Sequence, residues 1–334
     1  MKKFLPPIIA ILFAVVVFTT ALFFDLFHYA GKPAATVGKN RVLVINKGQR
    51  FKTIAQALGQ AGFIKSPIKF YLLARLKGDD KKIKAGEYLF SAVMSPQKIL
   101  ARLVSGEVKL HRLTIPEGYN LSQVAAQAQK AGLVDAAAFL KAARDAAETK
   151  VYDIPAATFE GYLYPDTYFF GRPVTAKKIV ATFVNRFNMV FTPAWRERAK
   201  QLNLTVHEVV TLASIIEKET GAAFERPIIS SVFHNRLKKR MRLESDPTVI
   251  YGIKNFDGNI TRRHLKTPTP YNTYTIKGLP PGPIANPGRA SLHAALFPKD
   301  TDYLFFVSKN DTTHKFTTHL EAHRKAVRKY QLRR

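Results

Sequence analysis

Two carboxylic acids in SIIEKETG (214–221) have the residue type and the proximity that acid–base catalysis would need. Glu217 and Glu219 stand two positions apart, directly before Gly221. Successive residues of a helix are about 100° apart, so these side chains point about 200° apart and cannot share one substrate atom. At most one is expected to be a catalyst, and helical periodicity does not choose between them. The alternative is an ordinary charged helix end, although acidic residues oppose the helix dipole at a C-terminus.

The surrounding elements must position these glutamates. Helical periodicity predicts a long helix over 203–221 and a second over 224–243, and a Pro/Gly-rich loop follows at 267–288. From about residue 155 to the end, the pattern predicts a mostly α domain with short strands (155–334).

An internal repeat precedes this domain. INKGQRFKTIAQALGQAGFI (45–64) matches IPEGYNLSQVAAQAQKAGLV (115–134) at a constant offset of 70 residues. Each copy predicts a strand, a glycine-bearing turn and a helix ended by glycine. This β–turn–α unit resembles LysM-like modules, which bind glycans that contain N-acetylglucosamine. We therefore expect small α/β modules at 41–107 and 108–150, with a bare structural spacer as the alternative.

The N-terminal segment is apolar enough to cross a membrane. Residues 4–24 carry no charge, and 21 residues at 1.5 Å each span a hydrocarbon core of about 30 Å. Lys2 and Lys3 precede the span, which favours a cytoplasmic N-terminus (1–3) and places the remainder outside. A linker is expected at 25–40. The overall prediction is an α+β protein with one transmembrane helix in the cell membrane.

Composition limits the chemistry. The formal net charge of +28 indicates an anionic partner, and export favours anionic envelope material or lipid headgroups over nucleic acid. With no cysteine in the chain, disulfides and thiol catalysis are excluded. His314, His319 and His323 come nearest to a metal-binding spacing but lack a nearby acidic cluster. We expect no metal site and no cofactor.

Five motifs together resemble one family. They are SIIEKET, SVFHNRL, MRLESDPTVIYG, TPYNTYTIKGLPPGPIANPG and EGYLYPDTY, in a chain that also has the anchor and the repeat. Their combination resembles the YceG-like endolytic murein transglycosylases. The resemblance implies a lysozyme-like catalytic domain that cleaves peptidoglycan strands between N-acetylmuramic acid and N-acetylglucosamine. The product carries a 1,6-anhydro ring, formed when the sugar's own 6-hydroxyl displaces the leaving group.

That chemistry explains why one carboxylic acid can suffice. Glycosidases normally need two, but here the nucleophile belongs to the substrate, so one glutamate can serve as acid and then as base. Such a group needs a raised pKa, which a partly apolar site supplies by desolvation. The resemblance assigns the role to Glu219, which precedes Thr220, with Glu217 as the reserve choice.

Further motif residues suit sugar recognition or local structure. Asp246 before Pro247 is expected to be a helix N-cap, and the alternative is a second catalytic carboxylate. Aromatic faces suit pyranose rings and an amide suits acetamido groups, although core packing would also explain the tyrosines. The expected substrate-binding residues are Asp246, Thr248, Tyr251, Asn272 and Tyr274.

The sequence thus predicts a membrane-anchored lytic transglycosylase of nascent peptidoglycan. The resemblance implies partners among the peptidoglycan synthases of elongation or division, beside the glycan strands and membrane lipid. Two alternatives stay open. One is a non-enzymatic, membrane-anchored glycan-binding scaffold, and the other is a muramidase that uses both Glu219 and Asp246.

Overall fold

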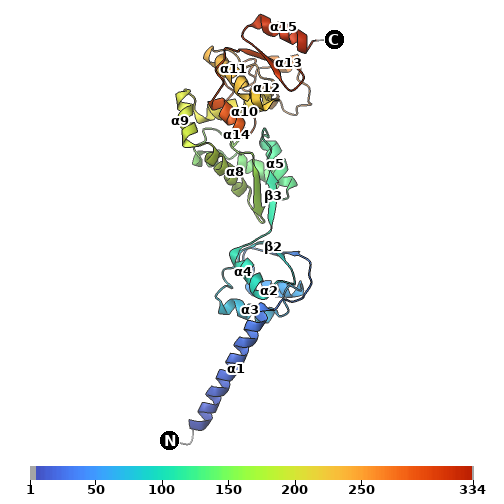
Figure 1. Cartoon of the computed structure of the whole chain (residues 1–334), viewed down its shortest axis with the longest axis vertical. Helices are drawn as coiled ribbons and strands as arrows, with labels where there is room; N and C mark the ends of the chain where they lie inside the picture. Colours follow the sequence, from blue (N-terminus) through green and yellow to red (C-terminus); the bar gives the residue numbers. More distant parts are fainter. Residues whose placement is uncertain (1–4, 333–334) are drawn as a thin grey trace. The chain divides into compact units, whose positions relative to one another are not determined.

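The computed structural model describes residues 5–332, and the chain forms two compact units (Figure 1). Unit 1 comprises residues 1–111 together with 169–173, and unit 2 comprises 112–168 together with 174–334. The expected cytoplasmic segment 1–3 lies outside the described residues.

Unit 1 begins with an apolar helix, α1 (Leu5–Gly31), which confirms the helix expected at 4–24. In the described part of the chain it is the one helix long and apolar enough to cross a membrane. It continues beyond the expected span because Leu26, Tyr29 and Ala30 are buried in the core of unit 1. The first part of the expected linker 25–40 is therefore helical.

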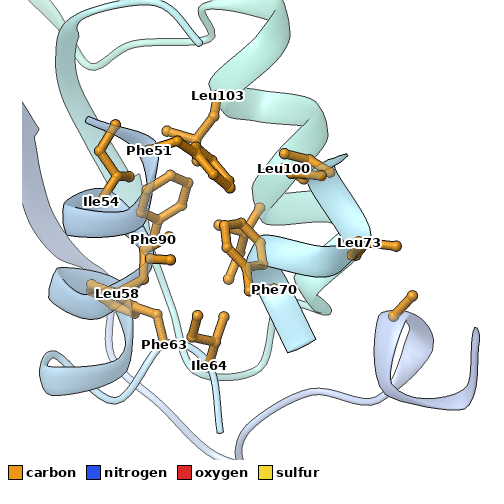
Figure 2. Packing of buried hydrophobic residues seen from close by; sticks show 14 of the residues in the cluster. Phe51, Ile54, Leu58, Phe63, Ile64, Phe70, Leu73, Phe90, Leu100 and Leu103 are labelled. Atoms are coloured by element: carbon orange, nitrogen blue, oxygen red, sulfur yellow. The ribbon is translucent and has the colours of Figure 1, made fainter. Parts of the chain in front are cut away.

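The rest of unit 1 is a small α/β module. Strand β1 (Arg41–Ile45) pairs antiparallel with β2 (Gly86–Phe90), with Leu43 opposite Tyr88. The helices are α2 (Phe51–Gln60), α3 (Pro67–Leu76) and α4 (Pro96–Ser105). Figure 2 shows side chains from these helices and from β2 meeting in one apolar core, with Phe51 stacked on Phe70 at 5.7 Å.

The second copy of the repeat has the same element order. It contains β3 (Leu110–Thr114), α5 (Leu121–Lys130) and α6 (Ala136–Ala143). Its turn glycine has φ 76°, and the glycine 70 residues earlier has φ 79°, so both copies need a residue tolerant of positive φ. However, β3 pairs with β4 (Thr167–Gly171), and the helices of this copy belong to unit 2. The second copy is therefore part of the larger unit, and its likeness to LysM stays a prediction.

Unit 2 is mostly helical with short strands, as the sequence predicts. The remaining elements are α7 (Ala146–Val151), α8 (Ala176–Val190), α9 (Pro193–Gln201), α10 (Val206–Glu219), η1 (Ala223–Glu225), α11 (Arg226–Lys238), α12 (Asp246–Tyr251), α13 (Arg262–Lys266), α14 (Arg289–Leu296), β5 (Phe305–Ser308), β6 (His314–Thr317) and α15 (Leu320–Tyr330). Strands β5 and β6 form an antiparallel hairpin.

Helix α10 is the central element of this unit. Thr205 and Glu208 form a capping box at its N-terminus, which satisfies backbone N–H groups of the first turn. Eight consecutive residues, Val209–Ile216, are buried, and the helix packs against α14 and α11. Its last residue is Glu219, after which the backbone becomes extended at Thr220. The helix is thus anchored along its length, and its C-terminal turn is held in place.

The EGYLYPDTY motif holds a glycine that no other residue can replace without a clash. Gly161 has φ 86°, and a Cβ at this position would lie 2.4 Å from Cγ of Pro283 and 2.8 Å from Cγ1 of Val210. We expect Gly161→Ala to lower the free energy of unfolding by about 3 kcal/mol, since backbone strain and overpacking add. Denaturant unfolding of the full-length protein in detergent measures this.

Gly278→Ala is the matched control, because Gly278 has φ 82° but no atom of the described residues within 4 Å of an added Cβ. Its free energy of unfolding should fall by only about 1 kcal/mol, because backbone strain is then the only cost. Equal losses at the two positions would contradict the close packing at Gly161.

Candidate active site

A polar cleft of about 430 Å³ in unit 2 lies at the C-terminal end of α10. Its walls come from α10, α11, the segment that leads into α12, the β5–β6 hairpin and α15. The lining residues are Glu219, Arg236, Leu243, Glu244, Asp246, Tyr274, Phe306, Val307, Ser308, His314, His323, Val327 and Gln331. Three of the sequence-predicted site residues, Glu219, Asp246 and Tyr274, therefore come together here.

Glu219 has the environment of a protonatable acid. Its side chain is partly buried, and the Ser245 hydroxyl donates a hydrogen bond to its Oε1 at 2.5 Å. Burial raises the pKa of Glu219 to about 7, and the negative charge of Asp246 acts in the same direction. The Ser245 hydrogen bond and the Arg236 charge oppose this shift in pKa. Near neutral pH this carboxyl group can both donate and accept a proton.

Glu217 points to another part of unit 2. Its Oε2 accepts a hydrogen bond from the backbone N–H of Gly288 at 2.9 Å, and its Oε1 lies 3.5 Å from a guanidinium nitrogen of Arg226. It is not among the residues that line the cleft in the described chain. The expected divergence of the two glutamates is therefore confirmed. Glu217 ties α10 to the N-terminus of α14 and to α11.

Asp246 and Tyr274 form a hydrogen-bonded pair in the cleft. The Tyr274 hydroxyl donates to Oδ1 of Asp246 at 2.7 Å. The prediction that Asp246 is the N-cap is wrong by one residue, because Ser245 occupies that position and Asp246 is the first residue of α12. The shift leaves the Asp246 carboxylate free of a capping role and exposed toward the cleft.

The other three expected substrate-binding residues are absent from the cleft lining of the described chain, and their side chains bond within the protein. Thr248 is fully buried and donates to the Ser245 carbonyl at 2.7 Å. Asn272 donates to three backbone carbonyls, and its Oδ1 accepts from the Tyr274 N–H at 2.9 Å. Tyr251 donates its hydroxyl to Glu160 at 3.1 Å. These contacts assign them to holding Ser245 and Tyr274 in place and to bracing α12.

Glu160, in the EGYLYPDTY motif, is a second buried carboxyl group of unit 2. It is 4% exposed, and both its oxygens accept from the backbone N–H of Leu121 at 3.1 Å. Asn286 donates to its Oε1 at 3.3 Å. Burial raises the pKa of Glu160 to about 7, against the lowering effect of its hydrogen bonds. It joins the start of α5, the Tyr251 end of α12 and the Pro/Gly loop, so this glutamate has a structural role.

Sequence reasoning missed several residues that line the cleft or support it. Ser245 reaches Glu219 across 26 positions of the chain, and Arg236 donates its Nε to the Leu304 carbonyl at 2.7 Å. His314 and His323, considered only for their metal-binding spacing, both line the cleft. Nδ1 of His323 is buried and has no hydrogen-bond partner among the described residues. Within residues 5–332, no group of three side chains suited to a metal ion is present.

Two neighbours of Glu219 should shift its pKa in opposite directions. Ser245→Ala removes a hydrogen bond that favours the ionised carboxylate, so the pKa of Glu219 should rise. Asp246→Asn removes a negative charge, so that pKa should fall. If the protonated form is the active acid, the alkaline limb of the pH–rate profile moves up in the first variant and down in the second. The shift for Ser245→Ala should be about one pH unit, since a hydrogen bond to a charged group is worth about 1.5 kcal/mol and one pKa unit about 1.4 kcal/mol.

Profiles of kcat/KM from pH 5 to 9 would measure the alkaline limb in the parent protein and in each variant. The direction in which the alkaline limb moves is compared after each profile is normalised to its own maximum. A general loss of rate in either variant therefore does not affect the comparison. If the alkaline limbs of the two variants moved in the same direction, or did not move, Glu219 would not be the group that titrates.

The site defines a class of protein. A mostly helical unit holds one protonatable carboxylic acid at the end of a buried helix, in a polar cleft, which is the arrangement of an acid–base enzyme. The chain belongs to the YceG-like family, whose model matches residues 43–329. The resemblance drawn from the five sequence motifs is therefore confirmed.

Named relatives cover most of the chain. It is 34% identical over 302 residues to an endolytic murein transglycosylase of Bacillus subtilis (strain 168), an alignment that covers 86% of this chain and 83% of the relative. It is 30% identical to an endolytic murein transglycosylase of Streptococcus pneumoniae (strain D39), covering 79% of this chain and 53% of that one. The crystal structure of a YceG-like protein from Listeria monocytogenes matches with a TM-score of 0.60 and 34% identity, covering 87% of this chain and all of that chain.

Proposed function

We propose that this protein is a lytic transglycosylase that cleaves the glycan strands of peptidoglycan, with Glu219 as its acid and base. The observation that carries the proposal is the position of Glu219 in the cleft, with a pKa raised to about 7 by burial. The names of the Bacillus and Streptococcus relatives support the substrate and the reaction type.

The reaction needs one proton donor and no water. Protonated Glu219 gives its proton to the glycosidic oxygen, and the bond between that oxygen and C1 of N-acetylmuramic acid breaks. The 6-hydroxyl oxygen of the same sugar bonds to C1 and closes the 1,6-anhydro ring. Its proton passes to the Glu219 carboxylate, which restores the starting state. A group with a pKa near 7 can do both steps at neutral pH.

The neighbours of Glu219 support this cycle. Ser245 fixes one carboxyl oxygen, so that Oε2 is left to face the scissile bond. Positive charge develops on the sugar ring as the bond breaks. The negative charge of Asp246, held in place by the Tyr274 hydroxyl, would stabilise it. In this assignment Asp246 and Tyr274 contact the substrate directly.

A muramidase is the second candidate, favoured by the position of Asp246 in the same cleft. Asp246 would then activate a water or attack C1, and the product would have a reducing end. A non-enzymatic scaffold would make no use of a carboxyl group that is costly to ionise in its cleft.

The N-terminal helix α1 supports a single-pass anchor in the cell membrane, with the catalytic unit on the outer side. The basic composition, with a formal net charge of +28, then suits anionic headgroups and wall components. Nascent strands would be the substrate because they are made at this membrane. The synthases of elongation or division are the partners that such a cut would serve.

Digestion of polymeric glycan by the full-length protein in detergent tests the proposal. We expect mass spectrometry to show new N-acetylmuramic acid ends that are one water lighter than reducing ends. The strand-length distribution should shift to intermediate lengths, as internal cleavage requires. New reducing ends would favour the muramidase. Release of disaccharides alone would contradict internal cleavage.

A further inference from the structure

Helix α3 of unit 1 has apolar side chains on both of its faces. Phe70, Leu73 and Ala74 are buried in the core. On the opposite side, Ile68 is 74% exposed and Leu76 is 64% exposed, with Leu72 between them at 40%. A helix that packs on one side and meets water on the other normally has a polar outer face. The outer face of α3 therefore exposes more apolar surface than such a helix normally does.

Helix α2 provides the contrast within the same unit. It also has 10 residues and buries one apolar face. Its exposed residues include Lys52, Thr53 and Gln56, as expected for a helix in water. The apolar outer face is thus a property of α3 and not of the module's helices in general.

Helix α3 is joined directly to the end of α1. Nζ of Lys69 lies 2.7 Å from the Asp25 carboxylate, and the Tyr29 hydroxyl donates to the carbonyl of Ser66 at 2.8 Å. Ser66 is the N-cap of α3, so the second contact holds the first turn of α3 itself. Figure 1 shows α3 beside the last turns of α1. The two helices therefore have a fixed relation to each other.

These contacts place α3 at the level where the apolar span ends. Residues 4–24 are uncharged, and their length of about 30 Å matches a hydrocarbon core. Asp25 is the first charge after them and is the residue that pairs with α3. The exposed apolar surface of α1 continues to Phe24 and Phe27, which are 73% and 74% exposed. The contacts of Asp25 and Tyr29 place the N-terminal turn of α3 beside this stretch of α1.

Basic side chains lie just after α1 and at both ends of α3. Lys32, Lys65, Arg75 and Lys77 are all exposed close to the ends of α1 and α3. Apolar residues beside lysine and arginine are typical of helices that lie in the headgroup region of a bilayer, where anionic lipids attract the basic groups.

We propose that α3 lies in the interface of the membrane that α1 crosses, with Ile68, Leu72 and Leu76 inserted among the lipids. The proposal rests on the membrane anchoring described under the proposed function. It makes unit 1 a body seated on the lipid surface, where a linker was expected at 25–40. The lipid is the occupant favoured by the contacts that hold α3 beside the end of the exposed apolar surface of α1.

Lipid quenching of single labelled cysteines in the full-length protein tests this. Because the chain has no cysteine, Leu72→Cys or Leu76→Cys introduces one labelling site for the fluorophore NBD. Phe18→Cys in α1 reports the bilayer, and Thr53→Cys on α2 is the exposed control. Each protein is reconstituted in phosphatidylethanolamine–phosphatidylglycerol vesicles, with or without lipids brominated high on the acyl chain.

We expect brominated lipid to quench the labels at 72 and 76 several-fold more strongly than the label at 53, with blue-shifted emission. Quenching at 18 without quenching at 72 and 76 would overturn the seating of α3 and leave the anchor intact. Absence of quenching at 18 would overturn the anchor and this proposal with it. Blue-shifted labels at 72 and 76 that brominated lipid does not quench would show that protein, as a partner or a second copy, covers α3.

Discussion

Glu219→Gln is expected to lower the rate of glycan cleavage by about 10³-fold or more, since one general acid contributes about 10² to 10⁴ and this group acts in both steps. The amide keeps the shape of the side chain and can still accept the Ser245 hydrogen bond, so the fold should persist. Initial rates of new strand ends, with circular dichroism of each protein, provide the measurement.

Glu217→Gln is the matched control on the same helix. Glu217 is bonded to Gly288 and Arg226 and lies away from the cleft lining of the described chain. Its amide can keep the Gly288 hydrogen bond, so activity should remain within about tenfold, a loss of under about 1.4 kcal/mol. Comparable inactivation by the two variants would contradict the assignment of the acid to Glu219.

Glu160→Gln should become more stable relative to the parent protein as pH rises from 4.5 to 8, by about 3 kcal/mol. The pKa of Glu160 in the folded protein, about 7, is above its ordinary value of 4.5, so the folded state binds the extra proton between these values. The stability due to that proton is present below pH 4.5 and is lost as pH rises through 7. Glutamine does not titrate, so the difference between the two unfolding curves isolates this group.

Tyr251→Phe tests whether the pKa of Glu160 causes this dependence of stability on pH. The Tyr251 hydroxyl donates to Glu160 and lowers its pKa, so its removal should make the loss of stability with pH steeper. Denaturant unfolding at several pH values in detergent would measure all three proteins. Unfolding free energies of the parent and Glu160→Gln that run parallel with pH would show that Glu160 is already ionised in the folded state.

Local patterns in the sequence predict the elements that carry the site. The helical periodicity of the apolar residues in 203–221 indicates α10, and the 70-residue offset indicates two strand–turn–helix units. Helical geometry alone also separates Glu217 from Glu219. These features depend on neighbours within a few residues, which is the range that periodicity and capping describe.

The contacts that hold the cleft and the rest of unit 2 together lie beyond that range. Ser245 is 26 positions from Glu219, and Tyr251 is 91 positions from Glu160. A tyrosine or an asparagine beside a Pro/Gly loop has the same chemistry whether it binds a sugar or its own protein. Asn272 turns inward to three backbone carbonyls, and only the folded chain reveals this.

The boundary between the two units also depends on contacts that local sequence patterns do not describe. Sequence similarity groups the second repeat with the first, but α5 belongs to unit 2, where Glu160 binds the N–H of its first residue, Leu121. Likewise, the segment after residue 24 has the composition of a linker, yet Tyr29 and Ala30 are buried in the core of unit 1. In both cases a tertiary contact decides what the local composition leaves open.

In the proposed reaction, one carboxylic acid cleaves the strand without water entering the product. Digestion of polymeric glycan by the full-length protein in water enriched in ¹⁸O tests it directly. We expect new N-acetylmuramic acid ends that are one water lighter than reducing ends and carry no ¹⁸O. Reducing ends that contain ¹⁸O would contradict it, because they would show that water, activated by a second carboxylate such as Asp246, attacks C1.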